Sequence, residues 1–160
     1  MRLDLASCPN LEFWVDGLPQ QKGSKKGIVV KRANVPFDTH WRKKYCANVV
    51  DDNKKDAAQW EQKIKLVALE FRPYKLWTCA VRLDVDFIMP RPKTVTRQDH
   101  TVKPDRDKLL RCVQDALTGM IYKDDSQVIE GETTKIYGSP MGARIVVWAL
   151  GDISYQRKLI

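Results

Sequence analysis

Four aspartates of the 160-residue chain stand in two pairs, Asp105 with Asp107 and Asp124 with Asp125, separated by one predicted helix. Side chains two positions apart inside a helix point about 200° away from each other. At a helix start, however, Asp105 can still be extended while Asp107 lies in the first turn, so that both carboxylates converge. We expect the helix and the turn after it to return the chain to the same end of the sheet, which brings the second pair to the first.

Carboxylates grouped in this way can bind Mg²⁺, a hard octahedral cation that keeps several waters and takes a phosphate oxygen as a further ligand. A cation bound there lowers the pKa of a water molecule and stabilises the charge of a phosphorane-like transition state. Beside a basic surface, the same carboxylates would repel DNA phosphates unless a cation lay between them. The pattern therefore indicates metal-dependent phosphodiester chemistry.

Each aspartate also has a structural interpretation that needs no metal. Asp105 or Asp107 can cap the helix or face its dipole, and the second pair can simply form a turn. Asp115, inside the helix, is expected to pair with Arg111 or with another basic neighbour.

The formal net charge of +8 points to a polyanionic partner. Residues 22–44 carry eight basic side chains against the single acid Asp38, and residues 91–111 carry seven more. Neutralised phosphates release counterions, so this balance suits DNA, although a basic surface that serves solubility alone is the alternative. DNA-backbone contacts are predicted for ten residues: Lys22, Lys25, Lys26, Arg42, Lys43, Lys44, Arg91, Lys93, Arg97 and Lys103.

Trp41 and Tyr45 lie among these basic residues. They either stack on exposed bases or pack in the core or in a dimer interface, and we favour packing for Trp41.

The spacing of apolar residues predicts an α+β (mixed α/β) fold in a single domain over residues 1–160, with its core at about 11–150. Apolar residues recur every three or four positions over 52–71 and over 105–117, which predicts two helices, the second ended by Gly119. Strands are predicted at 11–18, 28–30, 77–88 and 143–150, and at 127–137 with an interruption near Gly131. Basic loops are predicted on both sides of 28–30, and a polar, proline-bearing loop at 89–104. We expect the two helices to pack on one mixed sheet.

Cysteine spacing and hydropathy exclude several other classes. Cys8, Cys46, Cys79 and Cys112 lie more than thirty residues apart, and only two histidines accompany them, so reduced thiols fit better than a zinc site. The sequence shows no apolar run of about 18 residues and no basic start followed by an apolar stretch. We therefore expect a cytoplasmic protein that has no membrane partner.

The block at 103–128 resembles the RusA family of Holliday junction resolvases. The family pattern of Asp-x-Asp-Asn-x-x-Lys, Asp-Ala-Leu and Asp-Asp-x-Gln-Val is matched by Asp105-Arg106-Asp107-Lys108-Leu109-Leu110-Arg111, Asp115-Ala116-Leu117 and Asp124-Asp125-Ser126-Gln127-Val128. Similar too are the opening Gly17-Leu18-Pro19 with Lys22-Gly23-Ser24-Lys25, and the strand end Asp86-Phe87-Ile88-Met89-Pro90.

The resemblance implies a RusA-like fold and a homodimer that nicks a four-way DNA junction symmetrically, leaving 5′-phosphate and 3′-hydroxyl ends. It implies Mg²⁺ as the cofactor, with Mn²⁺ as a substitute, bound by Asp105, Asp107 and Asp125. Asp124 is a fourth acidic member of the implied site. Proteins of this kind are often encoded by phages or prophages.

Two catalytic positions depart from the family pattern. Lys108 stands where the family has asparagine, and Arg111 stands where it has a functional lysine. An arginine can neutralise a phosphate but cannot release its proton as an acid. Either Arg111 fills the lysine's role electrostatically, or Lys108 takes over that role.

Two other functions account for parts of the pattern. A metal-dependent nuclease that cuts other branched DNA fits the aspartates equally well. A non-catalytic basic DNA-binding protein explains the charge but leaves both acidic pairs without a purpose.

Overall fold

The computed structural model describes residues 10–23, 25–31, 45–51 and 54–150. In chain order the elements are β1 (Asn10–Asp16), β2 (Lys25–Lys31), β3 (Tyr45–Asp51), α2 (Lys54–Glu70), β4 (Val81–Met89), α3 (Arg106–Leu117), the 3₁₀ turn η2 (Asp125–Gln127), β5 (Val128–Glu130), β6 (Thr133–Tyr137) and β7 (Gly142–Ala149). Five strands form one mixed sheet, and two helices accompany it, which confirms the predicted α+β class.

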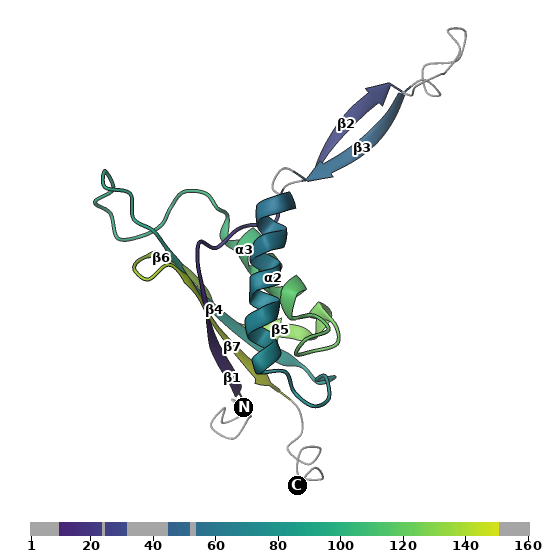
Figure 1. Cartoon of the computed structure of the whole chain (residues 1–160), viewed down its shortest axis with the longest axis vertical. Coiled ribbons are helices and arrows are strands. Elements are labelled where there is room, and N and C mark those ends of the chain that lie inside the picture. The colour runs from purple at the N-terminus through teal and green to yellow at the C-terminus, as the bar shows by residue number, and fades with distance from the viewer. Residues whose placement is uncertain (1–9, 24, 32–44, 52–53, 151–160) are drawn as a thin grey trace.

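The five-stranded sheet combines antiparallel and parallel pairs (Figure 1). Strand β7 lies between β1 and β4 and is antiparallel to both. On its other side β4 pairs in parallel with β5 near its start and with β6 near its end. Antiparallel neighbours can be joined by tight turns, whereas parallel neighbours need a long crossover. Helix α3 supplies that crossover between β4 and β5.

The core lies between one face of the sheet and the two helices. Along β4 the residues alternate between buried and half-exposed, with Val81, Val85 and Phe87 turned inward, as the sequence predicts. Opposite them, α2 contributes Trp60 and Ile64, and α3 contributes its buried apolar stripe. Both helices therefore cover the same face of the sheet.

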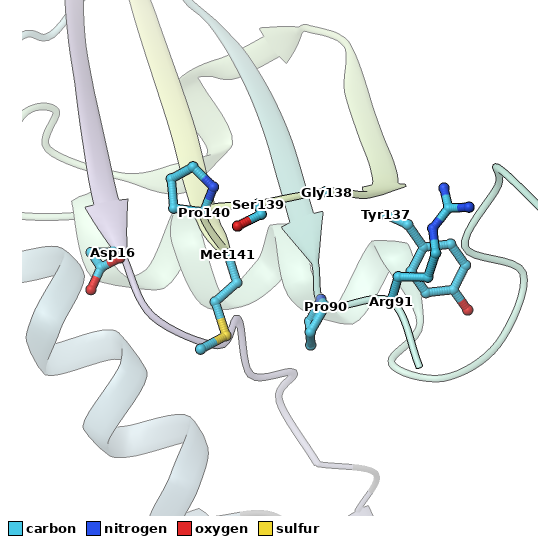
Figure 2. Close-up of a pocket in the computed structure, with 8 residues that line it drawn as sticks. All are labelled: Asp16, Pro90, Arg91, Tyr137, Gly138, Ser139, Pro140 and Met141. Carbon is cyan, nitrogen blue, oxygen red and sulfur yellow. The ribbon is translucent and has the colours of Figure 1, made fainter. Parts of the chain in front are cut away.

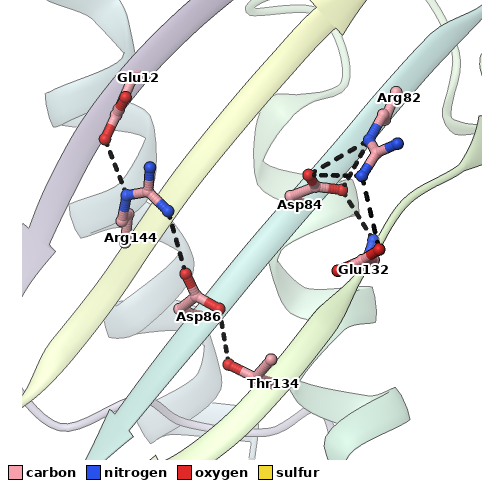
Figure 3. Close-up of polar contacts among 7 residues, drawn as sticks. All are labelled: Glu12, Arg82, Asp84, Asp86, Glu132, Thr134 and Arg144. Atoms are coloured by element: carbon pink, nitrogen blue, oxygen red, sulfur yellow. Dashed lines mark hydrogen bonds and ion pairs between the residues drawn. The ribbon is translucent and has the colours of Figure 1, made fainter.

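The other face of the sheet carries charged side chains in two separate networks of hydrogen bonds and ion pairs (Figure 3). Arg144 on β7 donates to Glu12 at 2.8 Å and to Asp86 at 3.2 Å, and Asp86 accepts from Thr134 at 2.6 Å. Nearer the start of β4, two nitrogens of the Arg82 guanidinium donate hydrogen bonds to the carboxylate of Asp84. Acidic groups outnumber basic ones in these networks, so this face is a poor surface for DNA phosphates.

Strands β2 and β3 form a separate antiparallel hairpin, with Lys25 opposite Asp51 and Lys31 opposite Tyr45. Figure 1 shows this hairpin beyond the start of α2, apart from the main sheet. The sequence predicts only a short strand at 28–30 here, so the structure extends β2 and adds β3. The predicted basic loop that reaches Trp41 falls on residues 32–44, outside the described part of the chain.

Most other predicted boundaries hold to within two residues, with one larger shift. The strand predicted at 77–88 begins only at Val81, because the segment before it binds another part of the chain. The amide of Gln127 donates to the carbonyls of Trp77 and Cys79, at 3.0 and 2.8 Å. None of the helices in the described ranges combines the length and apolar composition needed to cross a bilayer.

Two glycines with positive φ offer a matched test of the sheet's edge. A Cβ on Gly131 (φ 153°) would lie 1.9 Å from the Leu83 carbonyl oxygen, whereas a Cβ on Gly119 (φ 75°) would meet no atom within 4 Å. We expect Gly119→Ala to lower the free energy of unfolding by about 1 kcal/mol, the conformational cost alone. Gly131→Ala should lower it by about 3 kcal/mol or more, because overpacking adds to that cost. Urea unfolding of both variants measures the difference, and equal losses would contradict the β4–β5 packing described here.

Candidate active site

The carboxylate of Asp105 lies at the first turn of α3 but does not cap the helix. Asp105 is the N-cap residue with extended backbone (φ −73°, ψ 135°), and no capping bond from its side chain is present in the described structure. Instead, its Oδ2 lies 2.8 Å from the Nζ of Lys108, while its backbone N–H donates to Gln21 Oε1 at 2.6 Å. Asp105 therefore occupies the N-cap position without a side-chain capping bond, and its predicted extended conformation is confirmed.

Three lysines hold Asp105 in its charged form. The bond to Lys108, and beyond it the charges of Lys103 and Lys135, lower the pKa of Asp105 below its ordinary value of 3.8. The ammonium groups around this half-exposed carboxylate therefore favour its ionised form.

Lys135, which the sequence analysis did not select, fixes the loop that leads to Asp105. Its Nζ donates to the carbonyl oxygens of Val102 and Pro104 at 2.8 and 2.7 Å. Burial lowers the pKa of Lys135, and the charge of Asp105 offsets part of that effect. Lys135 lies two residues before the buried Tyr137 and therefore on the same, inward face of β6. A lysine at an inward position of a predicted strand is the sequence signal that could have identified it.

Asp107 and Arg111 occupy the exposed side of α3 just beyond Asp105. Residues four apart lie on the same face of a helix, so the Arg111 guanidinium follows the Asp107 carboxylate along the surface. Lys108 points instead to Asp105. The first two turns of α3, with the residue before them, therefore present the carboxylates of Asp105 and Asp107, the ammonium of Lys108 and the guanidinium of Arg111.

The second acidic pair has a different environment. Asp124 accepts from the backbone N–H of Ser126 at 2.9 Å, and its own N–H donates to Gln127 Oε1 at 2.8 Å. This reciprocal pattern is a capping box that begins η2. The bond from Ser126 lowers the pKa of Asp124. Asp125 follows as the exposed first residue of η2.

The two pairs lie at opposite ends of α3, so the expectation that one chain gathers them is wrong. Asp105 precedes the helix, and the second pair follows Tyr122, whose hydroxyl donates to the Gln114 carbonyl near the helix end. Twelve residues of helix span about 18 Å. The pairing of β4 leads to the same conclusion. Strand β5, which follows the second acidic pair, begins opposite Val81, whereas Lys135, which bonds to the residue before Asp105, lies opposite Phe87. These two positions are about 20 Å apart along β4.

The described part of the chain accordingly contains no group of three or more histidine, cysteine or acidic side chains that could hold a metal ion. Asp105 and Asp107 remain as a pair, and Mg²⁺ is commonly held by one or two carboxylates with water and phosphate oxygens. The residues at the start of α3 therefore fit a magnesium ion that shares its remaining positions with substrate. They do not form a closed cage.

Nine of the ten predicted DNA contacts, all except Lys22, divide into three groups. Arg91, Lys93, Arg97 and Lys103 are exposed in the loop between β4 and α3, as a phosphate contact requires. Lys25 and Lys26 lie on β2. Arg42, Lys43 and Lys44, together with the possible stacking residue Trp41, fall outside the described residues.

Lys22 is not available for the predicted phosphate contact. Its Nζ lies 2.5 Å from Glu61 on α2 and 3.1 Å from Asp115 on α3. Burial alone lowers the pKa of Lys22, but the bonds to these two carboxylates outweigh burial and raise it. Lys22 thus joins the two helices, and it is the basic neighbour that Asp115 was expected to find.

The Asp105–Lys108 pair gives a pH-dependent prediction. A carboxylate whose pKa is lowered by folding adds stability above its unfolded pKa, and that stability is lost as the pH falls through the folded pKa. We expect Lys108→Met to raise the Asp105 pKa towards 3.8, as followed by carboxyl-carbon NMR titration. Below about pH 3.8, the free energy of unfolding of this variant should fall less steeply with decreasing pH than that of the unaltered protein. Lys108→Arg is the control and should keep the lowered pKa, and an unchanged pKa in Lys108→Met would contradict the pairing.

Comparison with known proteins identifies the family of the chain. The family model described as "Endodeoxyribonuclease RusA" matches residues 37–148, well over half of the chain, including all of α3 and the strands of the sheet from β4 to β7. The chain is also 28% identical over 149 residues to "Uncharacterized protein YqaN" of Bacillus subtilis (strain 168), an alignment that covers 86% of this chain and 94% of that protein. The protein therefore belongs to the RusA family of endodeoxyribonucleases.

Proposed function

We propose that the protein is a magnesium-dependent endodeoxyribonuclease that resolves four-way DNA junctions by paired, symmetric nicks. The observation that carries the proposal is the start of α3, where Asp105 is free of a capping role and lies with Asp107 among basic side chains. This start lies at the carboxyl ends of the parallel strands β4 and β6. Ligands of sheets with parallel strands commonly bind at that edge.

The side chains at this edge suit phosphodiester hydrolysis. When bound, Mg²⁺ supplies a Lewis acid and an activated water. Asp105 and Asp107 would hold the ion, and Arg111 and Lys103 would neutralise the phosphate on either side of it. Lys108 is paired with Asp105 here, so it can also be the donor that protonates the leaving oxygen, a step that Arg111 cannot perform.

A homodimer is part of the proposal for two reasons. A four-way junction presents phosphates over a roughly two-fold surface, and two copies of one chain match that symmetry. Moreover, the whole of α3, whose twelve residues span about 18 Å, separates Asp105 from the segment that carries Asp125. If Asp125 contributes to the metal site, it therefore does so from the second copy.

Cleavage of a labelled synthetic four-way junction tests the activity directly. We expect paired nicks with Mg²⁺ or Mn²⁺ and none in EDTA, on the junction but not on its linear arms. Asp107→Asn should reduce the rate by more than the roughly 10- to 100-fold that loss of a mere supporting partner costs, with junction binding retained. Asp99→Asn changes an exposed aspartate of the neighbouring loop and should leave the rate unchanged.

The outcomes separate the rival functions. Equal cutting of flaps or replication forks would give a nuclease of broader substrate range. Junction binding with no cutting under any metal would reduce the aspartates to structural residues and leave a basic DNA-binding protein.

Mixed dimers test the origin of Asp125. If each site combines Asp107 of one copy with Asp125 of the other, mixing inactive Asp107→Asn with inactive Asp125→Asn should restore single nicks, because one of the two sites is then intact. Asp105→Asn mixed with Asp107→Asn is the control, since those two residues share a helix start and should not complement each other. Absence of restoration in the first mixture would show that Asp125 does not act across the dimer.

A further inference from the structure

A cavity of about 380 Å³ opens beside Asp105, between residues 18–21 and the loop at 100–104. This volume lies within the usual range for sites that enclose small molecules. The floor is formed by the buried side chains of Pro19, Met89 and His100. The rim carries the exposed side chains of Leu18 and Lys103. The cavity thus has apolar walls, a ring edge at its base and a cation at its mouth.

The cavity is joined to the candidate active site through the backbone of Asp105. Gln21 lines the cavity and accepts the Asp105 N–H at 2.6 Å. Lys103 and Pro104, the two residues directly before Asp105, form another part of the wall. An occupant of the cavity therefore lies against residues that hold the backbone of Asp105 in place.

His100 brings an unused hydrogen-bonding group to this region. Its side chain is 8% exposed, and its Nδ1, itself buried, has no hydrogen-bond partner in the described part of the chain, so the ring must turn before this atom can bond to a ligand. The ring packs against Tyr137, with ring centroids 4.6 Å apart. Burial, with the charges of Lys135 and Arg97, lowers the pKa of His100, so the imidazole is neutral at pH 7 and has one donor and one acceptor nitrogen.

We propose that this cavity receives one nucleobase, turned out of the DNA stack beside the phosphate that is cut. The proposal rests on the proposed function. The cavity is far too small for a duplex, whereas a single flipped base needs apolar surfaces for stacking and a few polar groups at its edge. Pro19 and Met89 provide the former, and His100 with the amide side chain of Gln20 provides the latter. Lys103 at the rim lies where the phosphate of the same nucleotide would enter.

A second cavity supplies a control. It has a volume of about 680 Å³, shares Pro90 with the first, and is lined by Arg91, Tyr137 and Met141 (Figure 2). The Arg91 guanidinium lies over the Tyr137 ring at 5.4 Å, while the carboxylate of Asp16 stands across the cavity. This cavity has none of the residues that support Asp105, so blocking it should not affect a base placed at the cut site.

The first test compares the binding of intact and abasic junctions in EDTA, where no cutting occurs. Junctions carrying one abasic nucleotide at successive positions around the crossover should bind about tenfold more weakly at one position, because stacking of that base is lost. Leu18→Trp should block the first cavity and abolish this difference. Met141→Trp is the matched control, since both side chains are 42% exposed at a cavity mouth, and it should keep the difference.

A second measurement uses the unaltered protein and so does not depend on the folding of a variant. A junction with 5-iodouracil at the sensitive position should photocrosslink to the cavity walls, with the adduct mapped by mass spectrometry to residues 18–21, 89–90 or 100–104. An adduct elsewhere, or no abasic sensitivity at any position, would overturn the proposal. So would an equal effect of both tryptophan variants.

Failure of this proposal can be told apart from failure of the proposed function. Magnesium-dependent junction cleavage without base sensitivity would refute the base pocket and support the nuclease activity. Base sensitivity and crosslinking without cleavage would support a DNA-binding pocket and refute the nuclease activity. Loss of dimerisation in Leu18→Trp, with no base sensitivity in the unaltered protein, would identify a side chain of a second copy as the occupant and would refute the nucleobase.

Discussion

The parallel pairing of β4 with β5 and β6 is the constraint on which the arrangement of the molecule depends. Parallel neighbours cannot be joined by a tight turn, so the chain must leave the end of β4 and return to its beginning. Helix α3 makes that return. Its start is thereby fixed at the carboxyl end of β4 and its finish near the amino end. Every functional side chain on or next to α3 inherits one of these two positions.

The two ends of the crossover differ in what they do with their aspartates. At the finish, the Asp124 side chain is used by the backbone of η2 and helps to fix the turn. At the start, the Asp105 side chain makes no capping bond to the helix backbone and pairs instead with the side chain of Lys108. The same residue type thus bonds to the backbone at one end and to a lysine side chain at the other. Hydrogen-bond partners, and not the residue type, distinguish the roles.

Local patterns in the sequence predict the elements well, because each pattern depends on neighbours within a few residues. The alternation along β4 and the helical spacing along α3 are of this kind. The sequence does not state which strands pair or in which direction, so the separation of the acidic pairs could not be predicted from their spacing. Contacts between distant residues escape for the same reason. Lys22 binds Glu61, 39 positions away, and Lys135 binds the carbonyl of Pro104, 31 positions away. Both looked like ordinary basic residues in the chain.

The attachment of Lys22 also connects two parts of the molecule that appear independent. The backbone N–H of Lys22 donates to the carbonyl of Lys108 at 3.3 Å, while the ammonium of Lys108 holds Asp105. Lys22 stands at the base of the segment that leads into the β2–β3 hairpin. The segment that leads into the hairpin is therefore bonded to Lys108, the residue whose ammonium pairs with the candidate catalytic carboxylate of Asp105. A load on the hairpin therefore reaches both helices, α3 through the Lys22–Lys108 bond and α2 through the chain that follows β3.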